Sequence, residues 1–150
     1  MPGIYSRLLE RVDFQHGCML KAVVIGVIIA DDNALLRQAL RLIVEAFPAR
    51  IIAEVGDGFE ACRAAEHEKP DLVILDISMP VMNGLTAAQH IRALYRDVHI
   101  IIVTMHTESN YVEEAFRSGA QGYVLKQKAR TELTTAMRTV LFGNTYCSHG

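Results

Sequence analysis

The sequence predicts an α/β protein in which a five-stranded parallel sheet carries helices on both faces. Apolar runs alternate with amphipathic segments along the chain, and short connections, several of them containing Pro or Gly, separate them. Continuous apolar runs are typical of strands that are covered on both sides. Strands that alternate with helices across short connections favour right-handed crossovers in a parallel sheet. With 150 residues, 51% of them hydrophobic, the chain is long enough for one domain with a complete core.

Five apolar runs predict the strands: Val23–Ala30, Ile51–Val55, Leu72–Leu75, His99–Val103 and Gly122–Leu125. Each run is short and lies between residues that favour turns or helix ends, as expected for buried strands.

Five segments with apolar residues at helical spacing predict the helices: Ala34–Ala46, Phe59–Glu68, Leu85–Leu94, Ser109–Ser118 and Thr131–Phe142. Pro48 closes the first helix, and Pro70 stops the second. Gly84 precedes the third helix, and Gly119 and Gly143 follow the fourth and fifth. The segments on either side of residues 22–142 differ. Residues 1–21 form an N-terminal extension that is either disordered or a short helix, and the polar residues 143–150 are typical of the start of a linker.

Composition excludes several classes of protein. The net charge is −2 and no stretch concentrates Lys and Arg, so we do not expect this domain to bind nucleic acid by itself. Cys18, Cys62 and Cys147 are odd in number and far apart, which indicates reduced thiols in a cytoplasmic protein. The histidines lack the spacing of a zinc site. The apolar stretch before Ala30 is too short to span a membrane and lacks the features of a secretory signal.

Polar side chains follow four of the predicted strands. Asp31 and Asp32 come after the first strand, Asp76 after the third, Thr104 after the fourth and Lys126 after the fifth. The carboxyl ends of parallel strands face one crevice, so we expect these groups to lie together. Crowded carboxylates need a cation or a proton, and carboxylate oxygens suit Mg²⁺. A carboxylate can also be a nucleophile, and an ammonium and a hydroxyl can neutralise phosphoryl oxygens. The set therefore predicts phosphoryl transfer.

A dinucleotide-binding domain is the alternative. Gly56-Asp-Gly58-Phe-Glu-Ala61 matches G-x-G-x-x-A after a predicted strand, and Asp76 follows about 20 residues later. The motif follows the second strand rather than the first. This interpretation also leaves four residues without a role: Asp31, Asp32, Thr104 and Lys126. A simple turn at Gly56 and Gly58 is the more economical interpretation.

The chain resembles the receiver domain of two-component response regulators. The resemblance covers residues 22 to about 142. The matching motifs are Ala30-Asp31-Asp32, Leu75-Asp76-Ile-Ser-Met-Pro80, Asn83-Gly84, Thr104 and Gly119-Ala-Gln-Gly-Tyr-Val-Leu-Lys126. The resemblance implies a flavodoxin-like receiver fold with strand order 2-1-3-4-5. Finer features, including Thr104-Met-His106 and the tail Gly143-Asn-Thr-Tyr146, are similar to the LuxR-type or NarL-type transcriptional subfamily.

The resemblance also implies roles for the residues at the sheet edge. Asp76 would accept a phosphoryl group from the phosphohistidine of a sensor histidine kinase. Asp32, Asp76 and the backbone carbonyl of Ser78 would bind Mg²⁺ directly, and Asp31 would bind it through water. Lys126 and Thr104 would contact the phosphoryl group.

Signalling output is implied in the same way. Thr104 and Tyr123 match a switch pair, in which the threonine turns toward the phosphoryl group and the tyrosine moves inward. We therefore expect a signalling protein rather than an enzyme, with a homodimer as one output. DNA would be reached only through a C-terminal domain that this sequence lacks. A degenerate receiver that serves only as an interaction module is disfavoured because the acidic set and Lys126 are intact.

Overall fold

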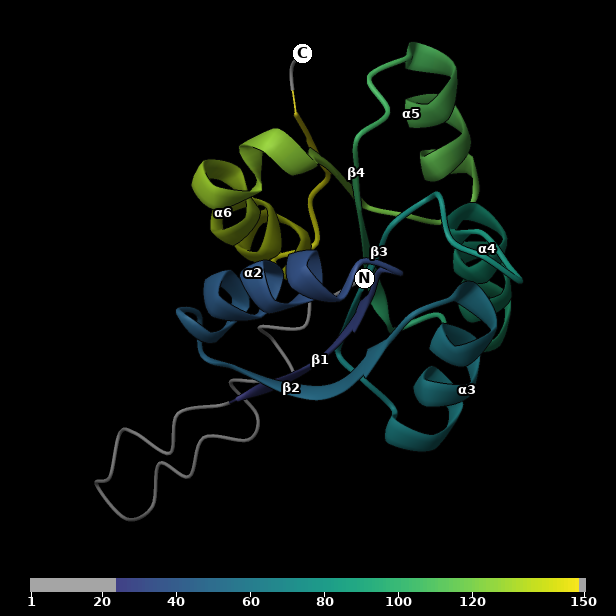
Figure 1. The fold of residues 1–150 in the computed structure, drawn as a ribbon, viewed down its shortest axis with the longest axis horizontal. Helices are drawn as coiled ribbons and strands as arrows, with labels where there is room; N and C mark the ends of the chain where they lie inside the picture. Colours follow the sequence, from purple (N-terminus) through teal and green to yellow (C-terminus); the bar gives the residue numbers. More distant parts are fainter. Residues whose placement is uncertain (1–23, 149–150) are drawn as a thin grey trace.

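The computed structural model describes residues 24–148, and these residues form one parallel sheet between two layers of helices (Figure 1). The strand order is β2-β1-β3-β4-β5-β6, and every neighbouring pair is parallel. The predicted fold class and the order 2-1-3-4-5 are confirmed, with a short sixth strand added at the β5 edge. The expected N-terminal extension, residues 1–21, lies outside the described residues.

The strands follow the apolar runs closely. Their bounds are β1 Ile25–Ala30, β2 Ala49–Val55, β3 Leu72–Leu75, β4 His99–Thr104, β5 Gly122–Leu125 and β6 Tyr146–Cys147. Of the four inner strands, β3, β4 and β5 are buried at every position, which explains why their sequences are almost wholly apolar. Strand β2 lies at the sheet edge and is only partly buried. It begins two residues before the predicted start.

The helices also lie close to their predicted ranges. Their bounds are α2 Ala34–Glu45, α3 Gly58–Glu68, α4 Gly84–Leu94, α5 Ser109–Arg117 and α6 Ala129–Leu141, with a 3-10 turn η2 at Lys126–Lys128. Side-chain caps fix three of the helix starts. Asn33, Asp57 and Asn83 each accept a hydrogen bond from a backbone N–H in the first turn of α2, α3 and α4, respectively. Two of these caps follow the acidic residues at the strand ends, so the caps help to set the loops of the site.

The sheet divides the core into two layers because side chains alternate along each strand. In β1, Ile25, Val27 and Ile29 pack in the cluster that contains residues of α2 and α6. Ile28 and Ala30 pack in the second cluster, under α3, α4 and α5. Figure 1 shows the same division, with α2 and α6 on one side of the sheet and the other three helices opposite. Both layers fix the strands, and therefore the strand ends, at defined positions.

Part of the tail after α6, where the start of a linker is expected, packs against the sheet. Within residues 143–150, Tyr146–Cys147 forms β6 and pairs in parallel with Gly122 and Tyr123 of β5. Gly143 takes a positive φ of 96° just after α6, a conformation that glycine adopts without strain and that turns the chain back toward the sheet. Among residues 24–148, no helix has both the length and the apolar character needed to cross a membrane.

Candidate functional site

The main chain holds the acidic residues at the carboxyl edge of the sheet. The N–H of Asp31 donates to the carbonyl of Val55 at 3.1 Å, and the N–H of Asp76 donates to the carbonyl of Ala30 at 3.0 Å. The side chain of Asp31 also accepts from the N–H of Asn33 at 2.8 Å, and this turn leads into α2. Both carboxylates are therefore fixed by the ends of the strands that precede them and by the neighbouring strands.

Lys126 brings the two buried carboxylates together. Its Nζ lies 2.9 Å from Asp76 Oδ2 and 3.0 Å from Asp31 Oδ2. Asp31 is 1% exposed and Asp76 is 4% exposed, so these ion pairs lie largely out of water. The sequence predicted that these three residues would meet, and the structure places them in contact.

Three carboxylates could hold a metal ion. One oxygen from each of Asp31, Asp32 and Asp76 lies within 4.8 Å of the other two. Asp32 is exposed, which leaves the cluster open to solvent on one side. Asp31 Oδ2 is buried and makes its ion pair with Lys126 but accepts no well-aligned hydrogen bond from the described residues. An all-oxygen donor set of this kind suits a hard cation such as Mg²⁺.

Burial and charge act against each other in this cluster. Burial raises the pKa of Asp76 above its ordinary value, and the charge of Asp31 adds to that rise, although Lys126 opposes it. Burial alone would lower the pKa of Lys126, but the hydrogen bonds and charges of Asp76 and Asp31 outweigh it and raise that pKa. The two carboxylates therefore favour the ammonium form of Lys126, and the surroundings of Asp76 compensate the negative charge of its carboxylate form only in part.

The predicted switch residues, Thr104 and Tyr123, both hydrogen-bond to the backbone of His106. Thr104 is fully buried at the end of β4, and its Oγ1 accepts a hydrogen bond from the N–H of His106 at 3.3 Å. Tyr123 is 1% exposed, and its hydroxyl donates to the carbonyl of His106 at 2.7 Å. Burial, followed by the charge of Glu108, raises the pKa of Tyr123 to about 12. The tyrosine thus already occupies the inward position in this structure, whereas the resemblance implies that it moves there on phosphorylation.

His106 connects the site to its surroundings, and sequence reasoning assigned it no chemistry. Its Nε2 and the hydroxyl of Ser78 share a hydrogen bond of 2.9 Å, and its ring stacks on Tyr111 with 4.1 Å between centroids. Ser78 lies in the loop after Asp76 and is exposed. The only sequence signal for this role was the position of His106 two residues after Thr104, in the loop that follows β4.

Two glycines allow the loop after Asp76 to lie close to its neighbours. A Cβ at Gly84 would lie 1.8 Å from the carbonyl oxygen of Asp76, and a Cβ at Gly58 would lie 2.3 Å from that of Met82. The N–H of Gly58 donates to the same Met82 oxygen at 2.9 Å. The start of α3 is therefore filled by protein backbone where a dinucleotide phosphate would have to bind. This contact explains the glycines and disfavours the dinucleotide alternative.

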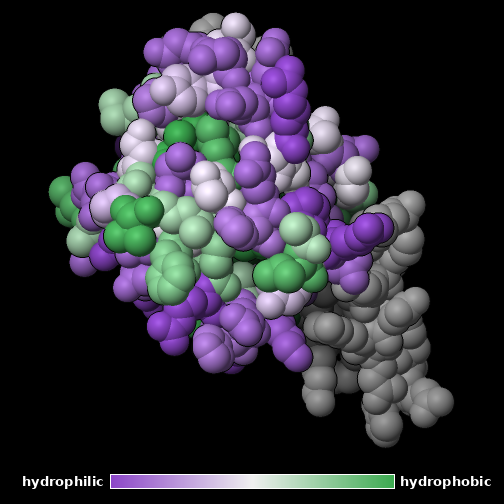
Figure 2. Space-filling model, turned by 90° about the vertical axis from the view of Figure 1, so that its right-hand side faces the viewer, coloured by the Kyte–Doolittle hydropathy of each residue, from purple (hydrophilic) through white to green (hydrophobic). Residues whose placement is uncertain are grey.

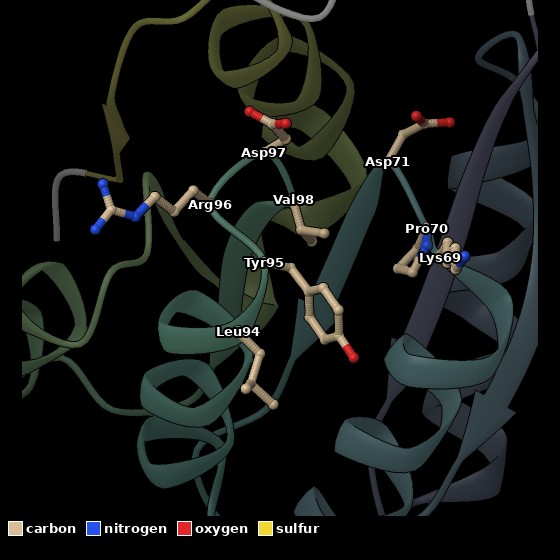
Figure 3. A pocket seen from close by; sticks show the side chains of 8 residues that line it. All are labelled: Lys69, Pro70, Asp71, Leu94, Tyr95, Arg96, Asp97 and Val98. Carbon is tan, nitrogen blue, oxygen red and sulfur yellow. The ribbon is translucent and has the colours of Figure 1, made fainter.

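A separate hollow lies at the other end of the strands, where β3 and β4 begin. It has a volume of about 450 Å³, and its lining comes from the segments before β3 and β4: Lys69, Pro70, Asp71, Leu94, Tyr95, Arg96, Asp97 and Val98. Figure 3 shows Tyr95 between Leu94 and Pro70, with Arg96 extending away from the others. The carboxylate of Asp71 already accepts from the N–H of Gly26 at 2.8 Å. None of the residues at the carboxyl edge lines this hollow.

A doubly wound parallel sheet with this acidic cluster and lysine at its carboxyl edge defines a receiver-type α/β domain. The sequence profile of the response regulator receiver domain matches residues 27–138. The chain belongs to the response regulator receiver domain family.

Curated relatives and solved structures agree with this assignment. The chain is 37% identical over 122 residues to the oxygen regulatory protein NreC of Staphylococcus epidermidis, covering 80% of this chain and 56% of that protein. It is 32% identical over 123 residues to the transcriptional regulatory protein DegU of Brevibacillus brevis, covering 81% and 52%. The chain therefore spans about half the length of the curated relatives it matches.

Two crystal structures of LuxR-family response regulators have the same fold. The protein from Aurantimonas sp. SI85-9A1 has a TM-score of 0.77 and 33% identity, with 82% of this chain and 89% of that chain covered. The DNA-binding response regulator from Staphylococcus aureus has a TM-score of 0.74 and 35% identity, with 79% and 99% covered. The chain is thus a receiver domain of the LuxR/NarL type, and such domains are signalling modules rather than conventional enzymes.

Proposed function

We propose that this chain receives a phosphoryl group on Asp76 from the phosphohistidine of a sensor histidine kinase. The observation that carries the proposal is Lys126, which bridges Asp31 and Asp76 at the edge of the sheet where three carboxylates meet. In the transfer, an Asp76 oxygen bonds to phosphorus as the phosphorus–nitrogen bond breaks, and the histidine ring leaves and takes up a proton. Positioning and charge neutralisation supply most of the catalysis for such a step.

A magnesium ion completes the proposed site. Asp32, Asp76 and the carbonyl of Ser78 would hold it directly, with Asp31 bound through water. When bound, Mg²⁺ neutralises the negative charge that gathers on the phosphoryl oxygens. Lys126 neutralises the same charge as a point cation, and the buried Thr104 hydroxyl donates to a phosphoryl oxygen.

The proposed output runs through Thr104 and Tyr123. Thr104 Oγ1 now accepts from the N–H of His106, and the Tyr123 hydroxyl donates to the carbonyl of the same residue. A shift of Thr104 toward the phosphoryl group would change the loop that both side chains hold. The surface formed by α5, β5 and α6 would then change shape. That change would alter dimerisation, or the activity of a C-terminal DNA-binding domain if the chain is part of a cytoplasmic transcription regulator.

The surface of the domain fits an output that depends on protein contacts. Figure 2 looks at the side where α3, α4 and α5 lie, and it shows several hydrophobic patches separated by polar residues. Val81 and Met105, in the loops after β3 and β4, are 82% and 71% exposed. These apolar side chains stand at the same edge as the acidic cluster, where a phosphodonor protein would have to approach.

The test is intact mass after incubation with a small-molecule phosphodonor and Mg²⁺. The wild type should gain one phosphoryl group, and Asp76→Asn should gain none. Asp57→Asn is the matched control, because Asp57 is a partly exposed carboxylate that caps α3 and asparagine is an equally good cap. A gain in both wild type and Asp76→Asn, or in neither, would contradict the assignment of the phosphoacceptor.

A further inference from the structure

The short strand β6 is held to β5 by more than its own backbone. The N–H groups of Tyr146 and Ser148 donate to the carbonyls of Gln121 and Tyr123 at 2.9 and 2.8 Å. Ser148 is 8% exposed although it lies near the end of the chain. A two-residue strand is short for a sheet edge, so these side-chain contacts are needed to explain its position.

Glu132 of α6 is the centre of that attachment. Its two carboxylate oxygens accept hydrogen bonds from the Tyr146 hydroxyl at 2.9 Å and from the Ser148 hydroxyl at 2.8 Å. Hydrogen bonds to a charged acceptor are stronger than those between neutral groups. One side chain of the last helix therefore fixes both ends of the described tail, and we call Glu132, Tyr146 and Ser148 the tail clamp.

The tail clamp reaches the residue next to Lys126. The N–H of Leu125 donates to the Ser148 hydroxyl at 3.2 Å, where a longer parallel ladder would use the Ser148 carbonyl. The following residue, Lys126, bonds Asp76 at 2.9 Å. Two consecutive residues therefore connect the two sites: Leu125 contacts the tail clamp, and Lys126 contacts Asp76.

Tyr123 forms a second connection. Its backbone carbonyl accepts from the N–H of Ser148, and its side-chain hydroxyl donates to the carbonyl of His106 in the loop after β4. Cys147, paired with Tyr123 in the sheet, packs against the core layer that contains Tyr123. Tyr123 in its inward position therefore contacts both the loop after β4, through its side chain, and the docked tail, through its backbone.

We propose that the docking of β6 on β5 is coupled to the phosphoryl state of Asp76, so that the tail clamp passes the signal to whatever follows residue 148. This inference rests on the proposed function of the pocket. A phosphoryl group on Asp76 gives Lys126 a new partner and fixes the end of β5, which holds the Leu125 N–H in place for Ser148. Coupling between two sites is reciprocal, so the tail clamp must in turn favour occupation of the pocket.

The reciprocity gives two measurements on the same 150-residue chain, with trifluoroberyllate and Mg²⁺ as the phosphoryl mimic. In the wild type, the mimic should slow hydrogen exchange at the Ser148 N–H by about fivefold, at the low end of typical coupling factors. In the Tyr146→Phe/Ser148→Ala double variant, which removes both hydroxyls of the tail clamp, the dissociation constant of the mimic should rise by a similar factor.

Thr145→Ala is the control, because Thr145 is exposed in the same segment. It should leave both the exchange and the dissociation constant unchanged. Equal binding of the mimic by the wild type and the double variant, when the N–H of residue 148 exchanges faster in the variant, overturns the coupling. An unchanged or faster Ser148 exchange on mimic binding overturns it too. Failure of the wild type to bind the mimic at all removes the proposed function of the pocket, and the coupling with it.

Discussion

Replacing Lys126 by methionine tests the energetics of the acidic cluster most directly. The change keeps much of the side chain's length and removes the ammonium that lies 2.9 Å from Asp76 Oδ2 and 3.0 Å from Asp31 Oδ2. Because both carboxylates are buried, no cation then offsets their mutual repulsion and the cost of their desolvation. Breaking a buried ion pair by removing one member costs about 3–5 kcal/mol.

The structure places the expected loss near the lower end of that range. Asp31 still accepts from the N–H of Asn33, and a backbone hydrogen bond from Ile77 still favours the charged form of Asp76. We expect the free energy of unfolding at neutral pH to fall by about 3 kcal/mol and the melting temperature by roughly 10 °C for a domain of this size. Urea denaturation in EDTA measures the first quantity, and calorimetry measures the second.

The pH dependence of the Lys126→Met loss has a definite sign. Burial already raises the pKa of Asp76 in the folded protein, and losing the ammonium raises it further. The folded state then binds a proton more tightly than the unfolded state, so acidification below the raised pKa should recover stability. The loss should be complete above that pKa.

Added Mg²⁺ gives an independent check on the same variant. A cation bound only by the folded state stabilises it, so Mg²⁺ should restore part of the stability of Lys126→Met. Arg130→Met is the control, because Arg130 is an exposed cation four residues further along the chain. A Lys126→Met stability within about 0.5 kcal/mol of wild type, the usual range for surface changes, and no response to Mg²⁺ would refute the reasoning.

Three further changes have defined outcomes. Gly84→Ala would place a Cβ 1.8 Å from the Asp76 carbonyl oxygen, so urea denaturation should show a loss of about 3 kcal/mol or more and phosphorylation of Asp76 should fall. Asn83→Ala removes the side-chain cap of α4 and should lower the free energy of unfolding by about 1 kcal/mol, measured in the same way; no change would mean that water replaces the cap. Asp32→Asn should weaken Mg²⁺ binding, measured by titration calorimetry, with a stability change below about 0.5 kcal/mol because Asp32 is exposed.

The sequence predicted the sheet well because its strands are buried on both faces. Such strands have no polar face, so Leu72–Leu75 and Gly122–Leu125 appear as uninterrupted apolar runs with the bounds that the structure shows. The edge strand β2 is only partly buried, and its start at Ala49 was missed. The acidic residues were found because parallel strands bring their carboxyl ends to one edge.

The remaining features depend on contacts between distant residues. The tail that carries Tyr146–Cys147 is hydrogen-bonded to Glu132, and nothing in the local sequence of the tail indicates that partner. The same is true of His106, which meets Ser78 only after the loops following β3 and β4 are placed side by side. The G-x-G-x-x-A match does not mark a dinucleotide site, because glycines also occur where two backbones touch, as Gly58 does at Met82.

The tight bend at Val81 links the loop after Asp76 to helix α3. Val81 has a φ of 66°, and the N–H of Met82 donates to the carbonyl of Pro80 at 2.7 Å across it. A β-branched residue in such a three-residue turn is strained, on the order of 1–3 kcal/mol, and persists only when its surroundings impose it. The N–H of Gly58, the first residue of α3, donates a hydrogen bond to the carbonyl of Met82, the residue that follows Val81. The hydrogen bond from the first residue of helix α3 therefore helps to hold the strained turn at Val81, in the loop that follows Asp76.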